Sequence, residues 1–361
     1  MRLISTRSLQ AGMKLAKSIY NENGIPLLSK GVSLTDKTIQ RLIRQGVSYV
    51  YIEDKATEDI VIESAVSEEL RIEATQEIKE IFHEISNAGL EKKSFLLDKQ
   101  GKKMGEIVKK LLAEIQQQPK QLSMLADIFV TDQYVFQHSL NVTIYSLALG
   151  ISLQFPQKKL LEIGVGSLLH DIGKIFIDQK ILNKKGRLTD EEFEVIKTHT
   201  ELGFDFLRQH IEIPSVVAHC AYEHHERLDG SGYPRGIKEN EIHPYGKLIA
   251  ITDVFDAVTS NRIYRDAMLP HEGLEILYAG SISQFDKHMV EEFKKSIIIY
   301  PNGLQVELSD GRKGVILRQN PHLNERPVVR VLSEDDQPLK VPYEIDLKEE
   351  LDTMIVSVMK E

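Results

Sequence analysis

The chain of 361 residues contains a single cysteine, Cys220, so it cannot form an intramolecular disulfide bond. This composition fits a reducing compartment. No apolar run approaches the roughly 20 residues that a membrane-spanning helix needs. The N-terminal segment MRLISTRSLQAGMKLAKSIY also lacks the uninterrupted apolar core of a signal peptide. We therefore expect a cytoplasmic protein that does not bind a membrane.

The chain has no excess of positive charge, since 45 Lys and Arg stand against 54 Asp and Glu, a net charge of −9. This balance argues against nucleic acid or an anionic membrane as a partner. A small anionic ligand needs only local positive charge and stays open. We see no short repeat or low-complexity tract, and no receiver, heme or nucleotide-sensor motif near the N-terminus, so the input signal stays unidentified.

Hydrophobic residues make up 42% of the chain and charged residues 27%, as in ordinary globular proteins, and the length suggests two or three domains. The patterns predict a mainly α protein in four parts. These are a small α+β module (1–57), a helical linker (58–120), a helical domain (121–292) and a small β unit (293–361).

In the first part, DKTIQRLIRQGV has helical spacing and VSYVYI alternates like a strand. The linker carries two apolar stripes, one around Ile78 and Phe82 and one around Val108 and Leu111. A signalling coiled coil would produce such stripes, as would two helices packed on a neighbouring domain. Because the stripes are short, the second interpretation is favoured.

The third part reads as consecutive helices. Thr189 and Glu192 form a capping box before FEVIKTHTELGFDFL, and Pro214 suits the first turn of a helix carrying VVAHCAYEHH. In the fourth part, LQVELSDGRKGVILRQN predicts a hairpin around an Asp-Gly turn, and RPVVRVL predicts another strand. TMIVSVM near the end predicts a strand or a helix.

Two motifs carry the chemistry, LLHDIGK and YEHHERLDGSGYP. Histidine and aspartate are ligands for divalent transition metals, and two such metals can polarise a phosphate and generate hydroxide near neutral pH. Further candidates lie on separate predicted helices. The full set of candidate metal ligands is His138, His170, Asp171, His199, His224, His225 and Asp253.

Each of these histidines taken alone could be an ordinary core or surface residue, but chance does not account for the whole set. His224 and His225 are adjacent, so on a helix they diverge by about 100°. They could then face two neighbouring ions, or one of them could lie outside the direct ligand set and hold a ligand in place. Asp256 follows Asp253 by one turn and could orient a ligand. Cys220 reads as buried packing.

The motifs HDIGK, IKTHTELG, EHHERLDGSGYP and ITDVFDAVTSNRIYR resemble the HD-GYP branch of the HD phosphohydrolases, over roughly residues 122 to 292. This resemblance implies an HD-type helical bundle with a dinuclear iron or manganese centre. It also implies a bacterial signalling enzyme that hydrolyses cyclic di-GMP to pGpG, and often on to GMP, by a metal-activated hydroxide.

Carried over by position, the resemblance makes the seven candidates metal ligands, with Asp171 bridging two ions. Lys174 would meet a substrate phosphate and would share the catalytic role with Asp171. The remaining substrate contacts would come from the signature loop and from two arginines: Gly230, Gly232, Tyr233, Pro234, Arg262 and Arg265. Read without the resemblance, Gly230 and Gly232 most simply permit a positive φ in a tight turn.

Two positions depart from the family pattern. Tyr134 stands where some members carry a glutamate that helps to hold a third metal, so we expect two ions. Ile263 replaces a proline after the last aspartate, which removes a loop constraint but no ligand.

Three rival functions stay open. The chain could bind cyclic di-GMP without cleaving it, could hydrolyse another nucleotide or cyclic dinucleotide, or could be an interaction scaffold. Candidate partners besides the substrate are a second copy of the chain and proteins that bind the N-terminal module. The group that protonates the leaving oxygen is not identifiable from the sequence.

Overall fold

The computed structural model covers all 361 residues. The described residues are 1–21, 24–62, 64–87, 90–117, 128–130, 134–184, 186–210, 213–260, 267–321 and 323–359. For 90–99, 128–130 and 134–135, only the backbone is described. Within the described part, no helix is long and apolar enough to cross a membrane.

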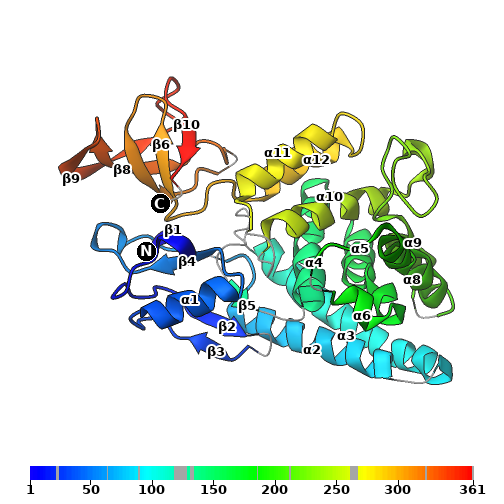
Figure 1. Ribbon diagram of the computed structural model, residues 1–361. Coiled ribbons are helices and arrows are strands. Elements are labelled where there is room, and N and C mark those ends of the chain that lie inside the picture. The colour runs from blue at the N-terminus through cyan, green and yellow to red at the C-terminus, as the bar shows by residue number, and fades with distance from the viewer. Residues whose placement is uncertain are drawn as a thin grey trace.

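The N-terminal module pairs short strands with one helix (Figure 1). Thr35 and Thr38 form a capping box that starts the helix, and Ile39 and Leu42 bury its apolar face, as the spacing predicted. β1 pairs antiparallel with β4, while β2 lies between β3 and β5. The elements are β1 (Arg2–Ser5), β2 (Ile19–Asn21), β3 (Pro26–Leu28), α1 (Asp36–Arg44), β4 (Tyr49–Ile52) and β5 (Ile128–Val130).

Two long helices follow, α2 (Glu68–Asn87) and α3 (Leu90–Gln117), and they pack on the bundle rather than standing apart (Figure 1). Ile78 and Phe82 of α2 and Val108 and Leu111 of α3 are buried in one hydrophobic core with the helices of the bundle. The interpretation of the two stripes as helices packed on a neighbouring domain is therefore confirmed.

The bundle is the helical domain that the sequence predicted, with α4 and α10 at its centre. Tyr145 of α4, Phe255 of α10 and Phe293 of α12 pack edge to face in its core. The helices are α4 (Tyr134–Ser152), α5 (Gln157–Leu169), α6 (Gln179–Leu182), α7 (Asp190–Lys197), α8 (His199–Leu207), α9 (Ser215–Glu223), α10 (Pro244–Thr259), α11 (Pro270–Gly280) and α12 (Lys287–Ser296).

The C-terminal unit is an antiparallel sheet in the order β10-β6-β7-β8-β9. The predicted hairpin is confirmed, with Gly311 at φ 86° in its turn, and the final segment is a strand. β9 was not predicted. The strands are β6 (Gln305–Leu308), β7 (Lys313–Arg318), β8 (Val328–Glu334), β9 (Gln337–Asp346) and β10 (Ile355–Val358).

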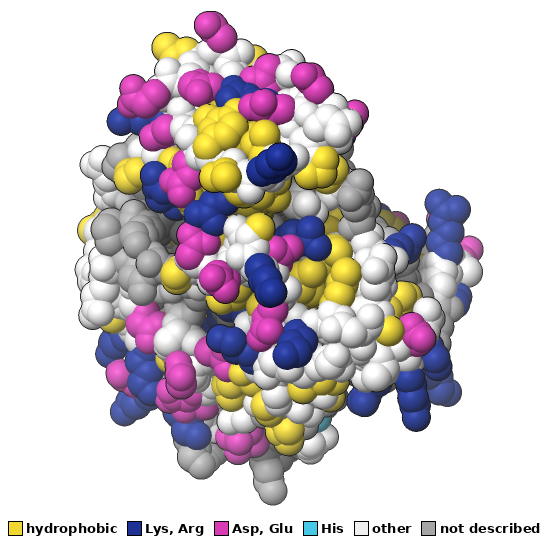
Figure 2. Space-filling model, turned by 90° about the vertical axis from the view of Figure 1, so that its left-hand side faces the viewer, with side chains coloured by type: hydrophobic (Ala, Val, Ile, Leu, Met, Phe, Trp, Pro, Cys, Tyr) yellow, Lys and Arg dark blue, Asp and Glu magenta, His cyan; other side chains and the backbone are white. Residues whose placement is uncertain are grey.

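The two terminal modules share a core although they lie at opposite ends of the sequence (Figure 1). Leu3 and Tyr51 of the first module pack in one cluster with Val306 and Val329 of the last. Figure 2 shows basic and acidic side chains interspersed over the face on which these modules lie. The N-terminal and C-terminal modules therefore fold against each other as one body beside the bundle.

An ion pair also joins the C-terminal module to Asp59, just after the N-terminal module, and we expect it to add little stability. Arg330 donates to both carboxylate oxygens of Asp59 at 2.7 Å, and these bonds lower the pKa of Asp59 to about 2. The Asp59 side chain is 54% exposed. Solvent screening should therefore limit the destabilisation by Asp59→Asn to less than about 1 kcal/mol.

The pH dependence of this effect has a defined sign. A lowered pKa stabilises the fold above the unfolded value of about 4, and this contribution is lost as pH falls toward 2. Urea unfolding of wild type and Asp59→Asn at pH 7 and pH 3 should show a smaller difference at pH 3. An equal difference at both pH values would contradict the assignment.

Candidate metal centre

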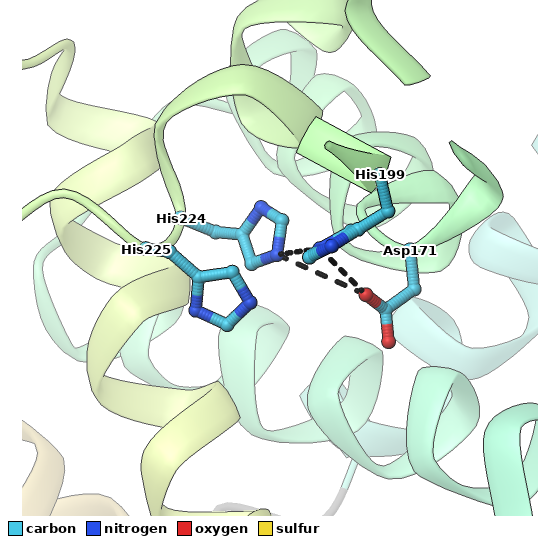
Figure 3. Close-up of side chains that lie close together, drawn as sticks. All are labelled: Asp171, His199, His224 and His225. Carbon is cyan, nitrogen blue, oxygen red and sulfur yellow. Dashed lines mark hydrogen bonds and ion pairs between the residues drawn. The ribbon is translucent and has the colours of Figure 1, made fainter. Parts of the chain in front are cut away.

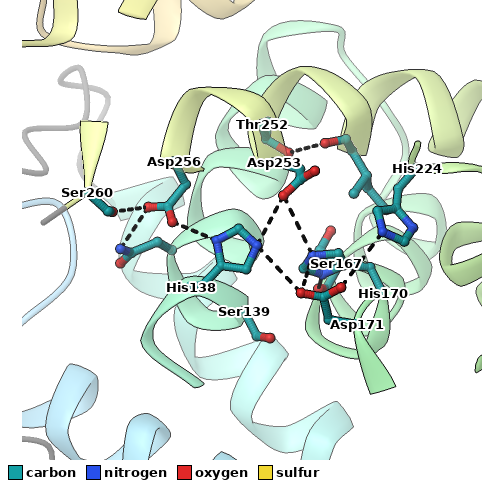
Figure 4. A network of polar contacts seen from close by, with 12 residues as sticks. His138, Ser139, Ser167, His170, Asp171, His224, Thr252, Asp253, Asp256 and Ser260 are labelled. Carbon is teal, nitrogen blue, oxygen red and sulfur yellow. Dashed lines mark hydrogen bonds and ion pairs between the residues drawn. The ribbon is translucent and has the colours of Figure 1, made fainter. Parts of the chain in front are cut away.

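The seven predicted ligands come from five places in the bundle, and the fold brings them together (Figures 3 and 4). Each lies near the end of an element or on a central helix. His138 is on α4, and His170 and Asp171 follow the end of α5. His199 opens α8, His224 and His225 follow the end of α9, and Asp253 is on α10.

Two local expectations were wrong. The predicted helix through FEVIKTHTELGFDFL breaks at Thr198, so α7 and α8 are separate and His199 begins the second. The helix before His224 ends at Glu223, so the adjacent histidines are not both helical. Their rings lie 4.0 Å apart between centroids and join one cluster, because the chain turns directly after Glu223.

Asp171 lies at the middle of the site, and its two carboxylate oxygens face different histidines. Oδ1 lies 3.3 Å from Nε2 of His199 and 3.8 Å from Nε2 of His224. Oδ2 lies 3.5 Å from Nε2 of His170 and 3.8 Å from Nε2 of His138. Asp171 is therefore the one residue shared by the two ligand clusters found in the described part of the chain.

Asp253 also spans the two groups. Its Oδ1 lies 3.1 Å from Nε2 of His138 and 4.0 Å from Nε2 of His170, and its Oδ2 lies 3.7 Å from Nδ1 of His225. Figure 4 shows Asp253 above Asp171, with His138 and His170 beside them. The two carboxylates therefore concentrate negative charge between the imidazoles.

Four of the imidazoles are held with Nε2 turned toward the carboxylates. His170, His199 and His224 each donate Nδ1–H to a backbone carbonyl, at 2.6, 2.6 and 3.1 Å. His138 donates Nδ1–H to Oδ2 of Asp256 at 2.7 Å, the orienting role foreseen for Asp256. Because a carbonyl or carboxylate only accepts, Nδ1 keeps its hydrogen, and each imidazole in its neutral form has the Nε2 lone pair toward the centre, as metal ligation requires.

The protonation states also suit a metal. Burial lowers the pKa of His170, His224 and His225, and lowers that of His199 to about 4, so these imidazoles are neutral near pH 7. Burial alone would raise the pKa of the two aspartates. The Lys174 ammonium opposes this effect most strongly, and the pKa of Asp171 lies well below its usual range.

Burial also disfavours a charge on His138, yet the carboxylates of Asp253 and Asp256 raise its pKa to about 9. In the absence of another cation, His138 therefore carries a proton between these two carboxylates. In addition, His170 Nε2 and Asp171 Oδ1 are buried without a hydrogen-bond partner among the described residues. Unsatisfied buried atoms are costly, and imidazole and carboxylate ligands fit a divalent transition metal that would satisfy them.

The predicted substrate contacts divide into two groups. Lys174 donates Nζ–H to Oδ2 of Asp171 at 2.5 Å and is partly exposed. The Tyr233 ring lies tilted against the His225 ring, with 4.7 Å between their centroids, so both residues border the centre. Pro234 follows in the same loop. Arg262 and Arg265, which were predicted to contact the substrate, lie outside the described residues, as does the side chain of Tyr134.

The signature loop folds back on the segment that carries the paired histidines. Gly230 has a φ of 83°, as predicted, but Gly232 does not adopt a positive φ, so that part of the prediction was wrong. A Cβ on Gly232 would lie 2.4 Å from the Arg227 nitrogen and 2.5 Å from the His225 oxygen. Gly232 is therefore required for close backbone approach, which places Tyr233 against His225.

The HD domain family matches residues 90–289. The chain belongs to this family. A KOW domain associated with HD domains matches residues 305–361, the C-terminal sheet. The solved structure of Bd1817, an HDG"Y"P protein from Bdellovibrio bacteriovorus, shares the fold with a TM-score of 0.53 and 17% identity, over 81% of this chain and 97% of that one.

Curated relatives support the resemblance to the HD-GYP branch. Cyclic di-GMP phosphodiesterase PA4108 of Pseudomonas aeruginosa is 28% identical over 96% of this chain and 88% of its own length. A cyclic di-GMP phosphodiesterase of Thermotoga maritima is 34% identical over 67% and 66%. A 3'3'-cGAMP-specific phosphodiesterase 1 of Vibrio cholerae is 40% identical over 40% of this chain and 33% of its own.

The sequence did not single out three residues near the centre. Asn141, three residues after His138 on α4, donates Nδ2–H to Oδ1 of Asp256 at 2.9 Å. Its spacing of three residues from His138 places both side chains on one face of the helix, and this spacing was the sequence signal that could have identified Asn141. Phe193 of α7 is 44% exposed and meets the Tyr233 ring edge to face. Lys197 lies over both of these rings, at 5.0 and 5.5 Å from their centroids.

Proposed function

We propose that this protein is a metal-dependent phosphodiesterase that hydrolyses cyclic di-GMP to pGpG or GMP, with two divalent ions, iron or manganese. The observation that carries the proposal is Asp171, whose two oxygens face two sets of imidazole nitrogens. His138 and His170 would hold one ion, and His199, His224 and His225 the other. Asp171 would be shared, and Asp253 would complete the set.

When bound, such a pair of ions polarises a phosphate and lowers the pKa of water. The protein's own groups then position the substrate. Lys174 is partly exposed beside the buried Asp171, so its ammonium can offset charge on a phosphate oxygen that approaches the centre. The aromatic rings of Tyr233 and Phe193 contact each other, and the Lys197 ammonium lies over the Tyr233 ring. This arrangement beside the centre suits a purine base linked to a phosphate.

Lys174→Met should lower kcat/KM by about a hundredfold, because a preorganised charge that stabilises the transition state is typically worth that much. The metal content should stay at the wild-type level, since removing a cation beside Asp171 does not weaken the attraction of that carboxylate for metal ions. Steady-state kinetics and elemental analysis check both statements. Lys180→Met, an exposed lysine on α6, is the matched control. Wild-type kinetics in Lys174→Met would refute the role.

The substrate is proposed to be cyclic di-GMP because the relative that spans nearly the whole chain carries that name. The name of the Vibrio cholerae relative supports 3'3'-cGAMP as the alternative. A receptor that binds without cleaving is less well supported, because six of the seven candidate ligands converge in the two clusters and Asp253 lies beside His138 and His225. A homodimer and proteins that bind the N-terminal module stay predictions.

Full-length protein, purified without oxygen and loaded with manganese or iron, should be incubated separately with cyclic di-GMP, 3'3'-cGAMP and cyclic di-AMP. Product chromatography should show pGpG or GMP from the first, formed faster than any product of the other two. A chelator should stop the reaction, and the metal should restore it. Tight binding of cyclic di-GMP without any product would instead support the receptor.

A further inference from the structure

Helix α2 carries a buried arginine that lies outside the segment matched by the HD domain family. Arg71 is 2% exposed, although arginine is rarely buried without a partner. It lies seven residues before Ile78 and fourteen before Ile85, so it shares the apolar stripe that packs on the bundle. The charge at that position faces the catalytic helices.

A hydrogen-bonded chain leads from Arg71 to the metal centre. Arg71 donates Nη1–H to Oδ1 of Asn141 at 3.3 Å, and Asn141 donates Nδ2–H to Oδ1 of Asp256 at 2.9 Å. Oδ2 of Asp256 accepts from Nδ1 of His138 at 2.7 Å. All four side chains are buried, and Figure 4 shows His138 between Asp256 and Asp253.

The order of donors and acceptors in this chain is fixed by Arg71. A guanidinium has donors and no acceptor, so the side-chain oxygen of Asn141 must face it. Gln137 donates to the same oxygen at 3.2 Å. The amide nitrogen of Asn141 then points at Asp256, which keeps that carboxylate an acceptor for His138 and leaves Nε2 of His138 toward Asp171 and Asp253.

We propose that Arg71 is a positioning residue for the His138 side of the metal centre. It acts through Asn141 and Asp256 and touches neither metal nor substrate. Because α2 follows the N-terminal module in the chain, the affinity of the His138 side for its ion depends on where α2 sits against α4. This inference rests on the proposed metal centre, and it is independent of which dinucleotide is cleaved.

The test is a titration of metal-free, full-length protein with Mn²⁺ alone, in which free Mn²⁺ is counted by its paramagnetic resonance signal. Wild type should bind two equivalents. Groups that orient a metal-bound histidine are typically worth about 10- to 100-fold in metal affinity, so Arg71→Met should weaken one equivalent by about tenfold. The other equivalent should be unchanged.

Asn141→Ala should weaken the same equivalent, and the double variant should be no worse than Asn141→Ala alone, since both changes break one chain. Arg71→Lys, which still only donates, should recover part of the loss. Lys110→Met removes an exposed cation that bridges α3 to Glu73 of α2, and it should bind Mn²⁺ like wild type. If Arg71→Met does not fold, Asn141→Ala and Arg71→Lys carry the test.

The outcomes separate this inference from the proposed function. Two equivalents of wild-type affinity in Arg71→Met, or in Asn141→Ala, overturn the positioning role alone. Equal weakening of both equivalents, together with a lower melting temperature of the metal-free protein, also overturns it, because that pattern indicates a purely structural role. A wild-type protein that binds no Mn²⁺ overturns the metal centre and the proposed function with it.

Discussion

Replacement of Asp171 by alanine is expected to remove both metal ions and to abolish hydrolysis. The two oxygens of this carboxylate face separate histidine groups, and Asp171 is shared by both ligand clusters. Loss of one stabilising donor in a preorganised site costs about a hundred- to a thousandfold, so loss of the whole centre should exceed a thousandfold. Asp171→Asn should resemble alanine, since an uncharged amide cannot bridge two cations.

Elemental analysis and product chromatography on the same preparations measure both effects. Asp178→Ala is the matched control, because Asp178 is an exposed aspartate seven residues further along, and it only caps α6. Its loss should cost no metal. Retention of two ions and full activity in Asp171→Ala would show that Asp171 does not bridge the ions.

Gly173→Ala is expected to damage the site without replacing any candidate ligand. Gly173 lies in the short 3-10 helix Ile172–Phe176, which packs against the start of α8. A Cβ there would lie 1.8 Å from the His199 carbonyl oxygen and 2.7 Å from the Gly203 nitrogen, both backbone atoms that cannot rotate away. The two elements must separate, which moves His199 away from Asp171.

Overpacking of this kind typically costs about 1–3 kcal/mol, and we expect the upper end of that range because both obstructing atoms are backbone. Metal content and hydrolysis should fall with stability. Gly105→Ala on α3 is the control, since a Cβ there meets nothing within 4 Å and alanine should stabilise that helix by roughly 0.5–1 kcal/mol. Wild-type unfolding and metal content in Gly173→Ala would contradict this account.

The sequence was sufficient to name the candidate ligands because all but His138 lie in the quoted local motifs. HDIGK contains His170 and Asp171, and EHHERLDGSGYP contains His224 and His225. These residues lie close together in the structure. The helix break at Thr198 was not visible, because a break inside a periodic apolar segment depends on tertiary packing rather than on local propensity.

β9 was missed for a different reason. Its sequence QPLKVPYEID contains Pro338 and Pro342, and proline within a run argues against a strand. β9 lies at the edge of its sheet, where an outward-facing backbone nitrogen needs no partner, so proline is tolerated there.

The contribution of Arg71 could not have been predicted from local pattern alone. It lies 70 residues from Asn141 and 115 more separate Asn141 from Asp256, so no spacing rule connects them. A charged residue on a stripe that otherwise buries apolar side chains was the available signal. The hydrogen-bonded chain from Arg71 to Asp256 is visible only in the folded structure.

The central claim is that Asp171 bridges two metal ions, and anomalous X-ray diffraction from crystals of the manganese-loaded protein tests it most directly. Two anomalous peaks are expected, each within coordination distance of a different Asp171 oxygen. One should lie beside His138 and His170, and the other beside His199 and His224. A single peak, or peaks that Asp171 does not contact, would contradict the account.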